Sequence, residues 1–410
     1  MWKDPYGNMI GSHVDDMCIV ATPKAREELK TALEAEGMMI HDLGELDTYI
    51  GIQITRDRTR KQICLYQEEY GAKVLKIFGM DDCHPVFTPI DTKNWTGDNL
   101  SAGEKKNYQK LIGCLLYMMH ATRPDFSFAV IRLLQFASKL LTDHWLALKR
   151  ILRYLKGTLE AKLILGDVND EALIGFFDSA YADATNRRST CGYLFHYYGS
   201  PISWASKVQK TIALSTVEAE YMAATEAAKQ CVWIQSVAKQ MGLPVNHPIQ
   251  LFEDNQGANA LTHNPEHHQR NKHIDVHERF VSSLVEGGVL SVMYIPTERM
   301  LADIFTKGLS RARHQIHCQL IVLCISTQHK CMQCDVYFIT QKHLHSHILS
   351  SHLNKRPRDS AILEKVSKKN KVFEAKELEA VITHRGKSRI DDVRGPRGGR
   401  NHSAEVGHGV

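Results

Sequence analysis

The sequence lacks any long apolar run. The longest late one, LIVLCI at residues 320–325, is far too short to span a bilayer, which takes about 20 apolar residues. The first residues, MWKDPYGNMIGS, contain no apolar core of the kind that a signal peptide has. We therefore expect a soluble intracellular protein with no membrane partner.

The sequence also has few cysteines that are spaced for disulfide pairing, and its net charge is small. Of the 10 cysteines, only Cys331 and Cys334 form a tight pair, which indicates reduced thiols rather than a disulfide framework. The formal net charge of +5 permits a polyanionic partner without requiring one. The chain of 410 residues, 43% apolar and 24% charged, is typical of a globular protein with roughly two or three domains.

The first part of the chain mixes strand and helix patterns. A turn at residues 11–17 leads into a strand, and a helix is predicted from Pro23 to the stop signal at Gly37. Residues 47–67 alternate as a hairpin does, with the turn at 56–60. Beyond Pro89 the period becomes helical. Amphipathic helices are predicted at 111–122, 126–141 and 144–159.

From Leu173 onwards, apolar residues again alternate with polar ones, which is the period of two typical of strands. Strands are predicted at 173–178, 192–198, 202–206, 249–254 and 289–295. Helices are predicted at 215–241, 256–263, 273–288 and 298–309. Strands and helices in this mixed order indicate an α/β sheet.

Acidic residues occupy comparable places in this α/β region. Asp178 and Asp254 end strands, Glu218 lies in the first turn of the long helix, and Asp303 lies in the last helix. If the first and fourth strands are neighbours, the side chains can converge, and like charges at such distances require cations such as Mg²⁺. Simpler roles remain open for each residue: a capping box for Glu218, turns for the two strand-end aspartates and a solvated helix face for Asp303.

Several sequence segments in this region resemble those of a known protein family. RRSTCGYLF, ISWASKVQKTIALSTVEAEYMAATEAAKQ, FEDNQGANAL, KHIDVHERFV and PTERMLADIFTKGL resemble the ribonuclease H domain of Ty1/copia-type retrotransposon Pol polyproteins. The resemblance covers residues 170–310 and implies a five-stranded mixed sheet flanked by helices. It also implies that Asp178, Glu218, Asp254 and Asp303 hold two Mg²⁺ ions and hydrolyse the RNA strand of an RNA/DNA hybrid. Ala180 and Tyr181 stand where the family usually has Asp and Trp, which removes no expected ligand.

The amino-terminal part resembles reverse transcriptases of the same group. HVDDMCIVA is similar to their YVDD turn, with His13 in place of the tyrosine, and further likeness extends to about residue 160. The resemblance implies an α+β palm, thumb and connection remnant over 1–160, with Asp15 and Asp16 as its metal pair. Because few residues precede Ser12, we expect the third carboxylate to be missing and no polymerase activity. A solvated hairpin turn is the simpler role for the two aspartates, and the helices at 111–157 should pack against the ribonuclease H domain.

A small zinc module is predicted at residues 329–354. Cys331, Cys334, His347 and His352 have Cys₂His₂ spacing, and Phe338 and Leu344 supply its two core positions. We expect a ββα finger with one Zn²⁺, whose folding depends on the metal. By resemblance to C2H2 fingers, the residues that face the bases of DNA or RNA are Thr340, Lys342, His343 and Ser346.

The remaining carboxy-terminal segments are a junction at 311–328, which matches neither neighbour, and a basic, disordered tail at 355–410. Basic runs in the tail suit phosphate contacts or nuclear import, so the nucleus is favoured over the cytoplasm. The leading hypothesis is a retrotransposon Pol fragment with ribonuclease H activity fused to one finger. The rivals are a non-catalytic, zinc-binding nucleic-acid-binding protein and a degenerate transposon fragment.

Overall fold

The computed structural model describes residues 2–4, 6–91, 95–137, 139–166, 173–184, 186–255, 272–321 and 323–325, without the side chains of 272–278. The helix predicted at 256–263, the finger at 329–354 and the tail at 355–410 lie outside these residues, and so do all of the predicted zinc ligands and base-contacting residues. Within the described ranges, no helix is long and apolar enough to cross a membrane.

The chain begins with a three-stranded antiparallel sheet and one helix. The sheet is ordered β1-β2-β3, and the predicted strand and helix near residues 18–36 are both present. Thr22 caps the helix, because its hydroxyl accepts a hydrogen bond from the Ala25 amide. The elements are β1 (Trp2–Lys3), β2 (Met9–His13), β3 (Asp16–Val20) and α1 (Pro23–Ala35).

A second sheet has five antiparallel strands in the order β13-β7-β6-β5-β4. It contains the predicted hairpin, which turns between Asp57 and Gln62, and it joins strands from distant parts of the sequence. The strands are β4 (Thr48–Tyr49), β5 (Ile52–Asp57), β6 (Gln62–Tyr66), β7 (Lys162–Leu165) and β13 (Leu323–Cys324).

The four helices that follow β6 share one apolar core, which includes Leu111, Leu115, Val130 and Leu152. α3 begins nine residues earlier than predicted, because Ser101 and Glu104 form a reciprocal capping box. The predicted helix at 126–141 ends early, since α4 stops at Leu134. The elements are α2 (Glu68–Ile77), α3 (Ala102–Ala121), η1 (Pro124–Phe126), α4 (Ser127–Leu134) and α5 (Thr142–Gly157).

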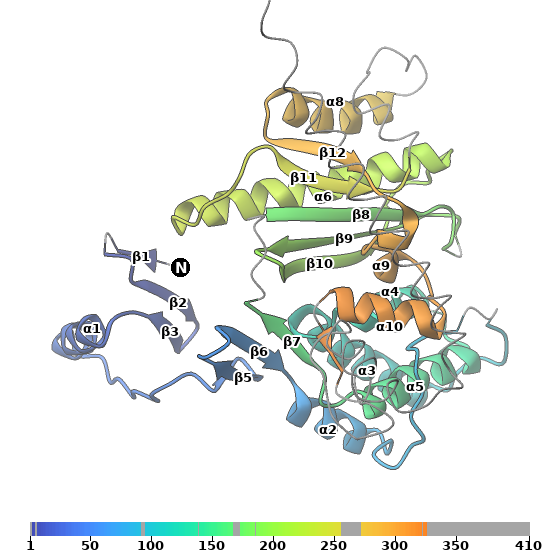
Figure 1. The fold of residues 1–410 in the computed structure, drawn as a ribbon. Coiled ribbons are helices and arrows are strands. Elements are labelled where there is room, and N and C mark those ends of the chain that lie inside the picture. The colour runs from blue at the N-terminus through green and yellow to red at the C-terminus, as the bar shows by residue number, and fades with distance from the viewer. Residues whose placement is uncertain are drawn as a thin grey trace, which may run out of the picture. The chain divides into compact units, whose positions relative to one another are not determined.

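The third sheet is the five-stranded mixed sheet expected from the resemblance (Figure 1). Its order is β10-β9-β8-β11-β12; β10, β9 and β8 are antiparallel, and β8, β11 and β12 are parallel. The first and fourth strands are therefore neighbours, as the convergence of the aspartates requires. The strands are β8 (Leu173–Ala180), β9 (Thr190–Tyr197), β10 (Ser200–Val208), β11 (Ile249–Glu253) and β12 (Leu290–Tyr294).

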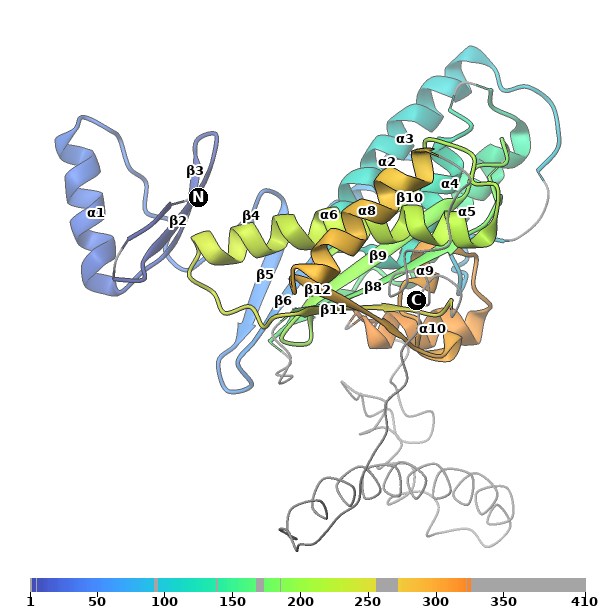
Figure 2. The same ribbon diagram turned by 90° about the horizontal axis from the view of Figure 1, so that it is seen from above.

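Helices cover both faces of the mixed sheet. α6 (Thr216–Gln240) and α8 (Lys272–Glu286) lie together on one face (Figure 2), where alanines of α6 pack against Phe177 and Leu251. α4 and α9 (Asp303–Thr306) lie on the other. Trp204 of β10 donates to the Met119 carbonyl at 2.7 Å, so the predicted packing of the 111–157 helices against this domain is present.

The predicted last helix is wrong in extent. In place of one helix at 298–309, the chain forms η3 (Thr297–Arg299) and the short α9, and Lys307 is extended. At this break Ile304 and Phe305 pack against the mixed sheet, and the buried Asp303 accepts a hydrogen bond from the Lys307 ammonium. Gly192 of β9 makes room for that contact, since a Cβ there would lie 2.6 Å from the Phe305 Cβ.

The predicted junction at 311–328 is described over residues 311–321 and 323–325, and these residues are folded into the molecule. α10 (Arg311–Leu320) buries His314, His317 and Cys318, and β13 pairs with β7. The His314 ring lies 3.1 Å from the Asp125 carbonyl oxygen, and the Cys318 sulfur lies 4.0 Å from the Tyr154 hydroxyl. This segment is therefore structurally part of the preceding domains.

Candidate metal centre

Three carboxylates from three separate elements meet at the end of the mixed sheet. Asp178 lies near the end of β8, Asp254 follows β11 directly, and Glu220 lies in the second turn of α6. One ligand oxygen from each lies within 4.8 Å of the others, and no other group of three or more such residues forms in the described ranges. These residues are the candidate metal centre.

The register of the two parallel strands brings the aspartates together. Phe252 pairs with Phe176, and the two rings stack with centroids 5.2 Å apart. Asp178 lies two residues beyond Phe176 in β8, and Asp254 lies two residues beyond Phe252, directly after the end of β11. Because side chains on a strand alternate with a period of two, both aspartates project from the same face as this aromatic pair.

Glu220, and not the predicted Glu218, completes the group. Residues two positions apart on a helix point in nearly opposite directions, so only one of these glutamates can face the aspartates. Glu218 instead holds the start of α6: its amide donates to the Ser215 hydroxyl at 3.1 Å, and its carboxylate accepts from the Leu214 amide at 2.6 Å. Glu218 therefore stabilises the helix start, as the sequence left open, but without a full capping box, because its carboxylate accepts from the Leu214 amide and not from the Ser215 amide.

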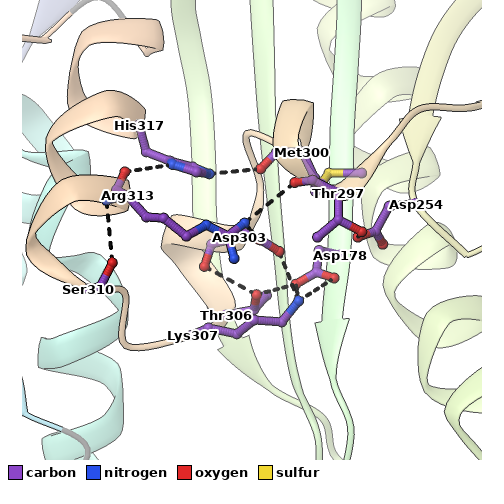
Figure 3. Close-up of polar contacts among 10 residues, drawn as sticks. All are labelled: Asp178, Asp254, Thr297, Met300, Asp303, Thr306, Lys307, Ser310, Arg313 and His317. Atoms are coloured by element: carbon purple, nitrogen blue, oxygen red, sulfur yellow. Dashed lines mark hydrogen bonds and ion pairs between the residues drawn. The ribbon is translucent and has the colours of Figure 1, made fainter. Parts of the chain in front are cut away.

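Asp303, the fourth predicted ligand, lies beside the group but is bound by cations of the protein (Figure 3). Its side chain is fully buried, and its two oxygens accept from the Lys307 ammonium at 2.8 Å and the Arg313 guanidinium at 2.7 Å. Lys307 also contacts Asp178 at 3.2 Å, and Thr306 donates a short hydrogen bond to the same aspartate. Asp303 is thus linked to Asp178 through Lys307.

Burial and like charges perturb the acidic groups. Burial raises the pKa of Asp178 to about 6, although the ammonium of Lys307 opposes this effect. Burial also raises the pKa of Glu220 well above its usual range, and the charges of Asp178 and Asp254 add to it. Glu253, next to Asp254, has its pKa raised by burial to about 8, and its Oε1 has no hydrogen-bond partner among the described residues. Lys307 and Arg313 compensate Asp178 and Asp303, whereas Glu220, Asp254 and Glu253 have no ion pair with a described lysine or arginine.

The donor set fits a hard divalent cation. Carboxylate oxygens are the ligands that Mg²⁺ prefers, and a site with several of them gains most from a cation when burial disfavours their charge. Asp178, Glu220 and Asp254 would hold such an ion. The substituted positions do not disturb this group, because Ala180 ends β8 and the side chain of Tyr181 is exposed.

The other predicted metal pair is in a different environment. Asp15 and Asp16 lie at the exposed turn between β2 and β3, where Asp16 pairs with His13. Across the described residues, neither aspartate belongs to a group of three potential metal ligands.

Fold and site together define a mixed α/β protein with the five-stranded sheet that the ribonuclease H resemblance implies and a group of three carboxylates at its end. Residues 5–92 match the family model described as reverse transcriptase (RNA-dependent DNA polymerase). The chain is 37% identical over 319 residues to the retrovirus-related Pol polyprotein from transposon TNT 1-94 of Nicotiana tabacum, and 34% identical over 308 residues to that from transposon RE2 of Arabidopsis thaliana. Over about three quarters of its length, the chain is therefore similar to retrovirus-related Pol polyproteins of plant transposons.

These alignments cover 75% and 74% of this chain but only 24% and 21% of the two polyproteins, so the chain spans about a quarter of their length or less. Among solved structures, the chain is similar to LC11-RNase H1 in complex with RNA/DNA hybrid. That likeness has 14% identity and a TM-score of 0.26 over 33% of this chain and 93% of the other.

Proposed function

We propose that this chain is a Mg²⁺-dependent nuclease that hydrolyses the RNA strand of RNA/DNA hybrids. The observation that carries the proposal is the convergence of Asp178, Glu220 and Asp254, which are far apart in the sequence, at one end of a mixed sheet. A group of this kind is not a structural ion pair, because all three members carry negative charge and each makes it more costly to ionise the others.

The protein's own residues have distinct roles in this proposal. Asp178, Glu220 and Asp254 bind the ion, and Thr297 orients Asp254 by donating to its Oδ2 at 2.6 Å. A divalent ion held there would activate a water molecule and stabilise the leaving oxygen of the phosphodiester. The 2′-hydroxyl of the substrate is the group by which such a site distinguishes RNA from DNA. A second ion, as the two-ion mechanism implies, would have to use Asp178 and Asp303.

The proposal is tested by incubating the full chain with a labelled RNA/DNA hybrid in Mg²⁺. We expect cleavage of the RNA strand by the unmodified chain and none by Asp254→Asn. Glu218→Gln is the matched control, because it changes a glutamate on the opposite side of the same helix and should retain cleavage. If the unmodified chain cleaves neither the hybrid nor single-stranded RNA, the nuclease proposal is abandoned.

The spacing Cys331-x₂-Cys334-x₁₂-His347-x₄-His352 supports a second proposal, that the carboxy-terminal region holds one Zn²⁺ and contacts DNA or RNA. Thr340, Lys342, His343 and Ser346 would face the bases, and the basic tail would add phosphate contacts that weaken with salt. From the same basic runs we also propose that the protein is nuclear. Imaging of a fluorescent fusion with and without residues 355–372 tests this location.

Polymerase activity is not part of the proposal. Asp15 and Asp16 lie on an exposed hairpin turn, and a nucleotidyl-transfer site needs further carboxylate ligands and a template-binding surface. Incorporation of labelled nucleotides on a primed template by the full chain would contradict this expectation.

A further inference from the structure

The ring of His317 in α10 lies with both of its nitrogens against backbone carbonyl oxygens. Nδ1 is 2.8 Å from the carbonyl oxygen of Arg313, one turn earlier in the same helix, and Nε2 is 3.0 Å from that of Met300 (Figure 3). The residue is buried, with 2% of its surface exposed. A carbonyl oxygen only accepts hydrogen bonds, so each ring nitrogen needs a proton to make its contact.

A neutral imidazole cannot make both contacts of His317. It carries one N–H group, and its other nitrogen would present a lone pair to a carbonyl oxygen. The imidazolium has two N–H groups and satisfies both oxygens. His314 shows the other arrangement, because its Nε2 lies 3.1 Å from the Asp125 carbonyl oxygen while its Nδ1 lies 3.5 Å from the Cys318 sulfur, whose thiol can donate. The contacts therefore suit a charged ring at His317 and a neutral ring at His314.

The surroundings of His317 favour its charged form. The residue lies in the last turn of α10, where the backbone carbonyl groups form the negative end of the helix dipole. The neighbouring cation Arg313 is itself compensated, because its guanidinium is paired with Asp303 at 2.7 Å. Burial lowers the pKa of His314, and the positive charge of His317 lowers it further, although Asp125 opposes both effects. The other titratable or charged side chains on the elements that adjoin the ring are Arg311 and Cys318 of α10, Glu298 and Arg299 of η3, Lys307 after α9 and Cys324 of β13.

The contact with Met300 ties α10 to the segment that flanks the metal centre. This segment, residues 297–303, begins with Thr297, whose hydroxyl donates to Asp254 at 2.6 Å, and it ends at the buried Asp303. Besides the contact with His317, the Met300 carbonyl oxygen accepts only a longer hydrogen bond, 3.4 Å, from the Asp303 amide among the described backbone groups. The hydrogen bond from His317 is therefore the shorter of the two that hold the middle of the segment.

We propose that His317 is a positioning residue that holds the 297–303 segment as an imidazolium, so that the alignment of Thr297 with Asp254 depends on pH. The inference rests on the proposed function and adds a control on its site. Imidazole is the side chain whose charge ordinarily changes between about pH 5 and about pH 8. When the ring loses one proton, one carbonyl oxygen faces a nitrogen lone pair. The Arg313 oxygen belongs to the same helix and stays in place, whereas Met300 lies on a separate segment, so the contact with Met300 opens.

The protonation is measured on the full chain by ¹⁵N NMR of the histidine rings, with His317→Gln to assign the signals. At about pH 5.5 we expect both nitrogens of His317 to be protonated, while His314 gives the signals of a neutral ring with its proton on Nε2. At about pH 8.5, one nitrogen of His317 should have lost its proton. A neutral His317 ring at the lower pH, or a ring with both protons at the higher pH, overturns the inference.

The hold on the 297–303 segment is measured by hydrogen exchange of its backbone amides, corrected for the intrinsic effect of pH on exchange. In the unmodified chain we expect protection to fall by about tenfold between about pH 5.5 and about pH 8.5, as for the loss of one hydrogen bond from a charged group. His317→Gln places an amide donor at the Nε2 position and does not titrate, so its protection should stay high at each pH. His317→Asn reaches only the Arg313 oxygen, so its protection should stay low. His247→Gln, at an exposed histidine, is the control and should keep the pH dependence of the unmodified chain.

Protection that does not change with pH in the unmodified chain, or equal protection in the folded Gln and Asn variants, overturns the inference. If a variant loses its circular-dichroism melting transition, the ring signals and the exchange profile of the unmodified chain decide the matter. Where the RNA/DNA hybrid is cleaved, the rate of the unmodified chain relative to that of His317→Gln should fall as pH rises through the same range, and a constant ratio overturns the effect on Asp254. Failure of the proposed nuclease gives a different result, namely no cleavage at any pH while the His317 signals and the exchange profile remain as expected.

Discussion

Two glutamates of α6 show how a difference of two positions decides function at the scale of a residue. Glu220 lies in line with the buried Ala224, Ala227 and Cys231, and its carboxylate reaches Asp178 and Asp254. Glu218 is half-buried and binds the backbone at the helix start. Removing the carboxylate of Glu220 should therefore affect the metal, whereas removing that of Glu218 should affect only the cap.

The first prediction compares Glu220→Gln with Glu218→Gln in thermal melts. Without divalent ions, Glu220→Gln should melt higher than the unmodified chain, by roughly 2–4 °C for each 1 kcal/mol gained, because a buried carboxylate with a raised pKa costs stability once ionised. Added Mg²⁺ should then raise the melting temperature of Glu218→Gln but not that of Glu220→Gln. Equal stabilisation of both variants by Mg²⁺ would exclude Glu220 as a ligand.

The second prediction concerns the pH dependence that Asp178 imposes. Its pKa is raised from 3.8 to about 6, so between these values the folded chain holds a proton that the unfolded chain has lost. The stability of the metal-free protein should fall as pH rises through this window. Mg²⁺ competes with the same proton, so the stabilisation by Mg²⁺ should grow from about pH 5 to about pH 7. A flat profile in unmodified protein, matching that of Asp178→Asn, would contradict this assignment.

At the scale of elements, α10 is held by buried polar contacts. Arg123 and Asp125 form a buried ion pair with a shortest distance of 2.8 Å, and the Tyr154 hydroxyl donates to the same carboxylate at 2.7 Å. Arg123 lowers the pKa of Asp125 against the cost of burial. The sulfur of Cys318 and the ring of His314 complete this cluster from α10. The buried charges of Arg123 and Asp125 therefore compensate each other, and removing one would leave the other buried without a partner.

The third prediction follows from that dependence. Asp125→Ala should destabilise the chain by about 3–5 kcal/mol, because it leaves the Arg123 guanidinium buried without its partner. Asp91→Ala removes a comparable ion pair with Arg150 near the surface and should cost less than about 1 kcal/mol. Urea unfolding of both variants measures the difference. If the free energy of unfolding fell equally in the two variants, the buried ion pair would contribute no more to stability than the exposed one.

The elements show where sequence patterns were sufficient. Strand periodicity predicted β8 and β11, and the aspartates at their ends, because alternation and turn residues are local signals. The choice of Glu218 failed because a capping box is also local, whereas the approach of Glu220 depends on how α6 packs on the sheet. Its place in the buried row with Ala224 and Cys231 was the available signal. The packing of α10 uses contacts with Asp125 and Tyr154, which no local pattern connects to His314 and Cys318.

At the scale of the whole molecule, two metals with different chemistry are expected on one chain. The carboxylate site suits Mg²⁺, and the Cys₂His₂ spacing suits Zn²⁺. The fourth prediction is that the purified full chain contains one Zn²⁺ by elemental analysis and that Cys334→Ser loses it. Cys18→Ser, at a cysteine of the amino-terminal sheet, should keep it. Unchanged zinc in Cys334→Ser would remove the finger from the proposal.

The pairing of β7 with β13 also bears on how the molecule is put together. Leu163 lies opposite Leu323, so the chain leaves the second sheet after β7 and returns to it beside the same strand. The described residues between these two strands, including all three carboxylates of the metal centre, therefore belong to a stretch of chain whose two ends are adjacent. Because β7 and β13 already hold its two ends together, closing this stretch of chain costs little loop-closure entropy, and we expect an exchange of the mixed sheet as one piece to leave the second sheet paired.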